Sequence, residues 1–155
     1  MAKQGEEMDS GLPVDPVVET VFKDVKLKRT KRLMVLVIKD DQITIEKIAK
    51  RKTNIEEAYG YFPETECRYI IWDVEDNSVN SKRPVSKLYF FTWCPQLANT
   101  RLKTLYSSQR RKRIGDVIKG AIDVHATTMN EVKEAIGEKV EPDSDEDENE
   151  DWLDD

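Results

Sequence analysis

The chain has 155 residues, which is enough for one domain with a hydrophobic core and cramped for two. Charged residues make up 36% of the chain and apolar residues 38%, and no apolar run is long enough to cross a bilayer. The first residues also lack the hydrophobic segment of a secretory signal, so we expect an intracellular protein and not a membrane or secreted one.

Charge is divided unevenly along the chain. The net charge is -6, yet residues 141–155 contain ten acidic residues and no basic one. Setting those ten aside leaves 21 of the 31 acidic residues against 25 cations, so the remainder carries about +4. We expect 141–155 to be a disordered acidic tail and 1–9 a disordered N-terminal extension, because both are too polar to bury a core. One domain is then expected over residues 10–140.

Hydrophobic periodicity and capping residues predict the elements of that domain. Asp15-Pro16 is typical of a helix start, and Asn54 with Glu57 has the spacing of a capping box. We expect, in order, a helix at 16–26, a hairpin of strands at 33–38 and 43–48, a short helix after Asn54, strands at 67–72 and 87–93, a long helix at 99–120, a short strand at 122–126 and a last helix after Thr128.

The connection at 73–84 is polar and is predicted to be an exposed loop. Helices and strands alternate along the rest of the domain, and no fixed-period repeat is visible. This order predicts a mixed sheet of four or five strands with helices packed on its faces.

The stretch from 99 to 120 organises the expected function. It carries one apolar patch within 102–106 and a second within 114–121, and on a straight helix these point about one residue's rotation apart. We therefore expect the axis to bend near Ser107 and Ser108, or a single extra residue to be absorbed as a bulge.

The same stretch concentrates positive charge, at Arg101 and Lys103 and in the run Arg110 to Arg113. No acidic residue lies within four positions before that run or two after it, so helical neighbours do not neutralise it. This density indicates a surface that docks on an acidic protein. Nucleic acid or anionic lipid would also satisfy the pattern, and a solvated helix face is the simplest alternative.

Catalytic signatures are missing from the sequence. His125, the single histidine, has no acidic residue at a spacing typical of a triad, and the six glycines form no phosphate-binding loop. Cys67 and Cys94 have no metal-ligand spacing and are expected to be buried, inert thiols without a disulfide. We predict a binding protein with no catalytic residue, no metal and no cofactor.

Several ordered blocks resemble the actin-depolymerising factor/cofilin family. The matching blocks are Ser10 to Pro16, Phe22 to Leu27, Phe62 to Tyr69, Phe90 to Pro95, Arg101 to Lys103 and Leu105 to Ser108. The resemblance covers roughly residues 10–140. It implies an α/β (α+β) class, with an ADF-homology, gelsolin-like fold: a single domain whose mixed five-stranded sheet is flanked by helices on both faces.

The resemblance also implies a function: binding of actin monomers and filaments, with filament severing and depolymerisation, by a monomeric protein. It implies monomer contacts at Ser10, Gly11, Arg101, Lys103, Arg110 and Arg111. It implies filament contacts at Arg83, Lys87, Glu138 and Lys139. Ser10 matches the family's regulatory phosphoserine, and phosphoinositides are expected at Arg110, Arg111, Lys112 and Arg113. The cytoplasm and cytoskeleton are the expected location, with the nucleus a second one.

Three features differ from the family's pattern: nine residues precede Ser10, the match slips by one residue after Ser108, and a short last helix leads to the acidic tail. Alternatives therefore stay open. One is a relative of glia maturation factor that acts on the actin branch complex. A second is a mainly monomer-binding member with weak severing, and a third is a nucleic-acid or lipid-binding module.

Overall fold

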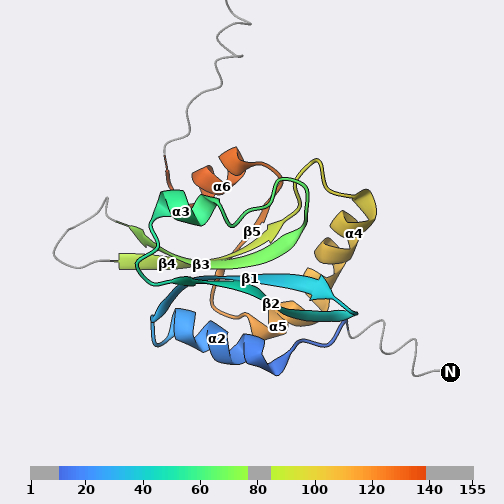
Figure 1. The fold of residues 1–155 in the computed structure, drawn as a ribbon, viewed down its shortest axis with the longest axis horizontal. Coiled ribbons are helices and arrows are strands. Elements are labelled where there is room, and N and C mark those ends of the chain that lie inside the picture. The colour runs from blue at the N-terminus through green and yellow to red at the C-terminus, as the bar shows by residue number, and fades with distance from the viewer. Residues whose placement is uncertain (1–10, 77–84, 139–155) are drawn as a thin grey trace, which may run out of the picture.

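The computed structural model describes residues 11–76 and 85–138. Five helical segments, one π-helical segment and five strands follow one another there in the order drawn in Figure 1. They are α2 (Pro16–Lys26), β1 (Lys31–Lys39), β2 (Gln42–Lys50), α3 (Ile55–Tyr59), β3 (Arg68–Asp76), β4 (Val85–Trp93), α4 (Thr100–Gln109), η1 (Arg110–Ile114), α5 (Gly115–Val117), β5 (Ile122–Ala126) and α6 (Met129–Ala135).

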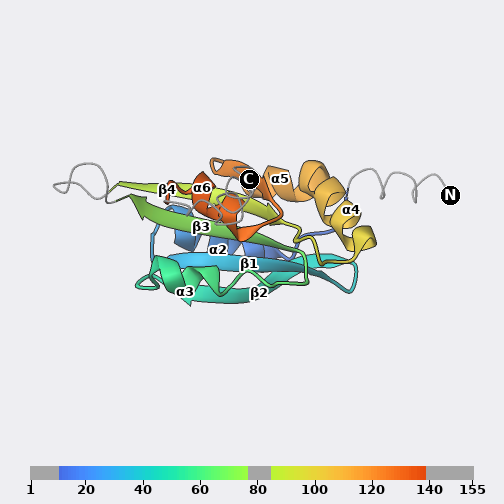
Figure 2. The same cartoon turned by 90° about the horizontal axis from the view of Figure 1, so that it is seen from above.

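The strands form one mixed sheet in the order β2-β1-β3-β4-β5. The pairs β1–β2, β1–β3 and β3–β4 are antiparallel, whereas β4 and β5 run parallel. A parallel pair needs a crossover, and the segment from α4 to α5 supplies it. Figure 2 shows β2 at one edge, with α4 and α5 on the side of β4. The predicted mixed, five-stranded sheet is confirmed.

Helices cover both faces of the sheet because neighbouring strand residues point to opposite sides. Ile71 belongs to the core under α2 and the α4-to-α5 segment, which also buries Phe90. Trp72 belongs to the core under α3 and α6, with Phe91 and Trp93. Figure 1 shows α3 and α6 on one side of the strands and α2 and α5 on the other. The single-domain, two-faced architecture predicted for the family is confirmed.

The predicted helix starts are confirmed by their caps. The Asp15 carboxylate accepts a hydrogen bond from the Val17 amide at 3.1 Å. Asn54 and Glu57 bond each other's backbone amides at 2.8 and 3.0 Å, a complete capping box. These bonds join residues two or three positions apart, which is why a local pattern predicts them.

The predicted loop at 73–84 was wrong at its start. Strand β3 continues to Asp76, and Asp73 is 4% exposed. The reason is that arginines from neighbouring segments neutralise the Asp73 carboxylate inside the sheet. The remainder of that loop, 77–84, lies outside the described residues.

Candidate functional site: the α4 to α5 surface

The start of α4 positions the first two predicted cations. The Asn99 side chain accepts hydrogen bonds from the amides of Arg101 at 2.7 Å and Leu102 at 3.3 Å, which confirms Asn99 as the cap. Arg101 is exposed. Lys103 is half-buried, and its ammonium donates to the Gln96 carbonyl at 2.9 Å. Both cations are therefore held on a rigid first turn.

The π-helical segment η1 follows α4 directly and allows both predicted apolar patches to be buried. A π-turn accommodates one extra residue in a helix and so rotates the residues after it relative to those before it. As a result Tyr106 before it and Ile114 at its end are both buried, at 2% and 0% exposure. The bulge was predicted, but near Ser107 and Ser108; it lies at 110–114. The helix also ends at Val117 and not at Gly120.

Arg110 is half-buried and takes part in the fold. Its Nε lies 3.0 Å from the Asp123 carboxylate, and its guanidinium lies over the Phe90 ring at 4.6 Å from the centroid. Arg110 is therefore neutralised by a residue outside its own helical segment, although its helical neighbours supply no acidic partner. Asp123 is on β5, so a search for charges along one helix could not find it.

Arg111, Lys112 and Arg113 are exposed on the outer side of η1. Within the described residues, the hydrogen bond from the Arg111 guanidinium to the Ser107 carbonyl is a long one, at 3.5 Å. All three residues are accessible to solvent. They are the part of the run that is placed to meet an anionic partner.

The N-terminal segment lies against η1. Gly11 has φ +87, and a Cβ built on it would lie 2.9 Å from the Lys112 Cβ and 3.1 Å from the Arg113 Cβ. The Leu12 amide donates to the buried Gln109 side chain at 2.7 Å. Only glycine combines this backbone conformation with so close an approach. The structure thus brings Gly11 beside the basic run, while Ser10 lies outside the described residues.

A depression of about 740 Å³ runs along the outer face of α4. Beside it in sequence, Leu97 is 75% exposed, an unusual exposure for a large apolar side chain. The depression is lined by Asn99, Arg101, Leu102, Thr104, Leu105 and Ser108. Its mixed apolar and cationic lining suits a protein partner better than a small polar ligand.

The model of the cofilin/tropomyosin-type actin-binding protein family matches residues 11–141. The chain belongs to this family. Actin-depolymerizing factor 1 of Arabidopsis thaliana is 34% identical over 127 residues, covering 79% of this chain and 89% of that protein. Actin-depolymerizing factor 12 of the same plant is 30% identical over 125 residues, with the same coverage. Actin binding and depolymerisation are thereby supported at the level of the cofilin/ADF family.

Solved structures agree on the fold. Actin depolymerization factor 2 of Plasmodium berghei superposes with a TM-score of 0.72 at 23% identity, over 82% of this chain and 96% of that one. The cofilin of Streptomyces griseoflavus gives 0.69 at 21%, over 79% and 90%. Glia maturation factor of Caenorhabditis elegans gives 0.61 at 16%, over 77% and 88%. At such identities the likeness shows the cofilin/ADF fold alone.

The two described residues predicted for filament contacts, Lys87 and Glu138, lie away from α4. Lys87 is exposed on β4, six residues before Trp93, so roughly 20 Å of strand separates it from the end that leads into α4. Glu138 is exposed just after α6. Arg83 and Lys139 lie outside the described residues. Among the described residues, Lys87 and Glu138 are therefore not brought together with Arg101 and Lys103.

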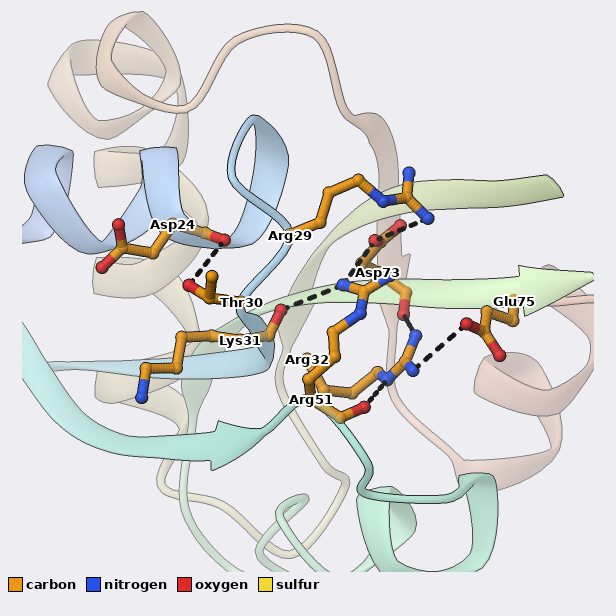
Figure 3. Close-up of polar contacts among 8 residues, drawn as sticks. All are labelled: Asp24, Arg29, Thr30, Lys31, Arg32, Arg51, Asp73 and Glu75. Atoms are coloured by element: carbon orange, nitrogen blue, oxygen red, sulfur yellow. Dashed lines mark hydrogen bonds and ion pairs between the residues drawn. The ribbon is translucent and has the colours of Figure 1, made fainter. Parts of the chain in front are cut away.

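Sequence reasoning missed an ionic cluster around Asp73 (Figure 3). An Arg51 nitrogen lies 2.8 Å from the Asp73 carboxylate, and an Arg29 nitrogen lies 3.9 Å from it. Arg32 donates to the Asp73 carbonyl at 2.9 Å and lies 3.4 Å from the Glu75 carboxylate. The cluster joins the turn before β1, the end of β2 and the middle of β3. The sequence feature that could have indicated this cluster is the acidic Asp73 directly after the predicted apolar strand at 67–72.

Residues 11–76 and 85–138 were compared with two patterns, a metal-binding group and a membrane-spanning helix. There, no group of three or more histidine, cysteine or acidic side chains could hold a metal ion. No helix in those ranges is both long and apolar enough to cross a bilayer. His125 is exposed on β5, as predicted.

Both cysteines are free and buried, as predicted. A hydrogen bond from Cys67 lowers the pKa of the Cys94 thiol and outweighs the opposing effect of burial.

Proposed function

We propose that the chain binds actin monomers and filaments and promotes filament severing and depolymerisation. The observation that carries the proposal is the convergence of Gly11 with Lys112 and Arg113, on the helical segment that also presents Arg101 and Lys103. Family membership supplies actin as the partner. The packed N-terminal segment and the cations then form one continuous contact surface.

The physical basis is a rigid display of charge. The Lys103 ammonium is held by the Gln96 carbonyl, so little of its side-chain entropy is lost when an acidic surface docks, and the cap fixes the backbone of Arg101. Positive charge beside the depression on α4 steers an acidic partner and sets its register. Arg110 contributes indirectly, because its bond to Asp123 holds η1 against the sheet.

The remaining roles are proposals of the same kind. A phosphate on Ser10 would place about two negative charges beside the contact surface and weaken actin binding. Phosphoinositide headgroups would compete with actin for the cations of η1, which are Arg110, Arg111, Lys112 and Arg113. Filament contacts are proposed at Arg83, Lys87, Glu138 and Lys139. The protein is proposed to be a cytoplasmic, cytoskeletal monomer that also enters the nucleus.

Charge reversal at Arg101 and Lys103 tests the proposal. The double variant Arg101→Glu, Lys103→Glu should bind ADP-actin monomers roughly ten- to a hundredfold more weakly, about 1.4 to 2.8 kcal/mol. Lys47→Glu is the matched control, because Lys47 is exposed on β2 at the far edge of the sheet. Affinity is read from native-gel titration. An unchanged affinity in a folded double variant would refute the site.

Filament pelleting distinguishes the alternatives. A severing and depolymerising protein moves actin from the pellet to the supernatant, whereas a mainly monomer-binding relative lowers the pellet only in proportion to its own concentration. A glia-maturation-factor-like regulator would leave plain filaments intact and bind the branch complex.

The block Phe90 to Pro95 favours the actin-binding interpretation over that alternative. A nucleic-acid module is disfavoured because Phe90 and Trp93 are buried core residues.

A further inference from the structure

The two cysteines flank the paired ends of neighbouring strands, since Cys67 directly precedes β3 and Cys94 directly follows β4. The register of β3 and β4 pairs Arg68 with Trp93, and one further step places Cys67 opposite Cys94. Directly opposed residues of an antiparallel pair have Cα atoms roughly 4.5 to 5.5 Å apart and side chains on one face. Both thiols belong to the core under α2 and α4, at 0% and 2% exposure. This spacing lies within the range that a disulfide requires.

Hydrogen bonds show that the two thiols meet. Cys67 and Cys94 are hydrogen-bonded to each other; this bond is the largest cause that raises the pKa of Cys67 and lowers that of Cys94. The Cys94 thiol also donates a hydrogen bond to the Lys103 carbonyl, with 3.9 Å between the sulfur and the oxygen. Cys94 is therefore the thiol more readily converted to a thiolate, and Cys67 is the neighbour able to attack it after oxidation.

A polar path connects the buried pair to the surface. Ser107 on α4 hydrogen-bonds the Cys94 thiol, and its Oγ lies 3.3 Å from Nε2 of His125. His125 is exposed on β5, and an imidazole nitrogen can accept a proton through a hydrogen bond from a hydroxyl. A proton leaving Cys94 thus has an acceptor within two hydrogen bonds, although the sulfur itself is covered.

We propose that Cys67 and Cys94 form an oxidisable dithiol that a peroxide converts to an intramolecular disulfide. The Cys94 thiolate attacks one peroxide oxygen, an S–O bond forms, the O–O bond breaks and the leaving hydroxide takes the released proton to form water. The Cys67 sulfur then attacks the Cys94 sulfur; the S–S bond forms, the S–O bond breaks, and the departing hydroxide takes the Cys67 proton. Two thiols and one hydrogen peroxide give one disulfide and two waters.

The disulfide would tie the start of β3 to the end of β4 beneath α4. It closes a covalent loop through the β3–β4 connection and so removes entropy from the unfolded chain. The Lys103 carbonyl loses its thiol donor in the same step. The proposal rests on the thiols alone and stands whether or not the chain binds actin.

Treatment of the folded, full-length chain with hydrogen peroxide tests the proposal. After quenching and alkylation under denaturing conditions, the intact mass should show the loss of two hydrogen atoms and no alkylated thiol. Proteolysis should yield one peptide pair linked through Cys67 and Cys94, and dithiothreitol should restore two alkylatable thiols. The oxidised chain should melt several degrees higher than the reduced one.

Single-thiol variants are the matched controls. Cys67→Ser and Cys94→Ser each remove one partner, so neither should lose two hydrogens within one chain. The proposal is overturned if the wild-type chain keeps both thiols under conditions that fully oxidise free glutathione. It is equally overturned if the cysteines gain oxygen separately, or if they link two chains together.

The role of His125 has its own readout. His125→Gln keeps a hydrogen-bonding side chain of similar size but is not a base near neutral pH, so the rate of disulfide formation should fall severalfold. The product and the melting temperature should match those of the wild type. An unchanged rate would refute the relay through Ser107 and His125.

Discussion

The guanidinium of Arg110 lies between the Phe90 ring and the Asp123 carboxylate, inside a run of four cations. Its neighbours Arg111 and Arg113 are exposed. One run of identical charge thus contains a residue that fastens the helix to the sheet and others that face solvent. Whether a cation of this run binds the sheet or faces solvent depends on the direction of its side chain relative to the sheet, and not on its chemical type.

Replacing Arg110 should therefore affect stability. Arg110→Ala removes a partly buried ion pair and a cation–π contact, and the free energy of unfolding should fall by about 1 to 2 kcal/mol. Arg111→Ala is the matched control and should change it by less than about 0.5 kcal/mol, because Arg111 is exposed. Urea denaturation measures both variants. Equal effects would contradict the assignment of Arg110.

Glu46 predicts a pH dependence of stability. Its carboxylate accepts two bonds from Arg68, at 2.8 and 3.0 Å, and these lower the pKa of Glu46 below 4.5. The Glu46–Arg68 pair stabilises the folded state fully above about pH 4.5, and this stabilisation is lost as the pH falls through the lowered pKa of Glu46. The stability difference between wild type and Glu46→Gln should shrink over that acid range, in urea titrations. A constant difference would contradict this.

At the scale of elements, η1 allows the burial of two apolar patches that a regular helix could not bury together. The extra residue of a π-turn lets both Tyr106 and Ile114 face the sheet. It also places Gly115 against the preceding turn, where a Cβ would lie 2.8 Å from the Arg110 carbonyl oxygen and 2.4 Å from its guanidinium. The π-segment therefore requires glycine at this position.

Gly115→Ala should destabilise the protein by about 1 to 3 kcal/mol, because a backbone oxygen has to move to admit the methyl group. Gly60→Ala is the control: its φ of -68 suits any residue and its nearest contact is 3.3 Å. Chemical denaturation compares the two. A neutral Gly115→Ala would show that η1 is a regular helix in solution.

Gly11→Ala should separate binding from stability. The methyl group would collide with the Lys112 and Arg113 side chains and force a positive-φ residue to adopt a strained conformation, so the segment before Leu12 should leave η1. We expect weaker binding to ADP-actin monomers with a nearly unchanged melting temperature. Wild-type affinity in this variant would show that the packing of Gly11 is not part of the actin contact.

At the scale of the whole molecule, the two faces of the sheet have different proposed uses. The face under α2 and α4 supports the surface proposed for actin monomers, and Lys87 and Glu138 lie elsewhere. Monomer and filament binding should then be separable by mutation. Lys87→Glu should weaken filament pelleting and leave monomer affinity within about twofold, since the charge lies too far from α4 for an unscreened interaction.

The acidic tail is predicted to act through charge and not through packing. Removing residues 141–155 should leave the melting temperature unchanged, because ten acidic residues with few apolar ones bury little surface. If the tail competes for the cations of η1, the truncated chain should bind actin more tightly at low salt and with a steeper salt dependence of affinity, because salt no longer also releases a competing tail. Calorimetry and titrations at two salt concentrations measure these effects, and a large drop in melting temperature would contradict the prediction.

The sequence by itself determined the order of helices and strands, the caps at Asp15, Asn54 and Thr128, and the need for a bulge in the long helix, because each depends on residues a few positions apart. Only the tertiary structure decided which charges are neutralised and which thiols meet. Arg110 of η1 contacts Asp123 of β5, Arg51 after β2 contacts Asp73 of β3, and Cys67 before β3 contacts Cys94 after β4. These segments meet only when the sheet forms and its helices pack on it. Local patterns carry no information on such pairs, since the pairing order of strands is set by burial of the whole core.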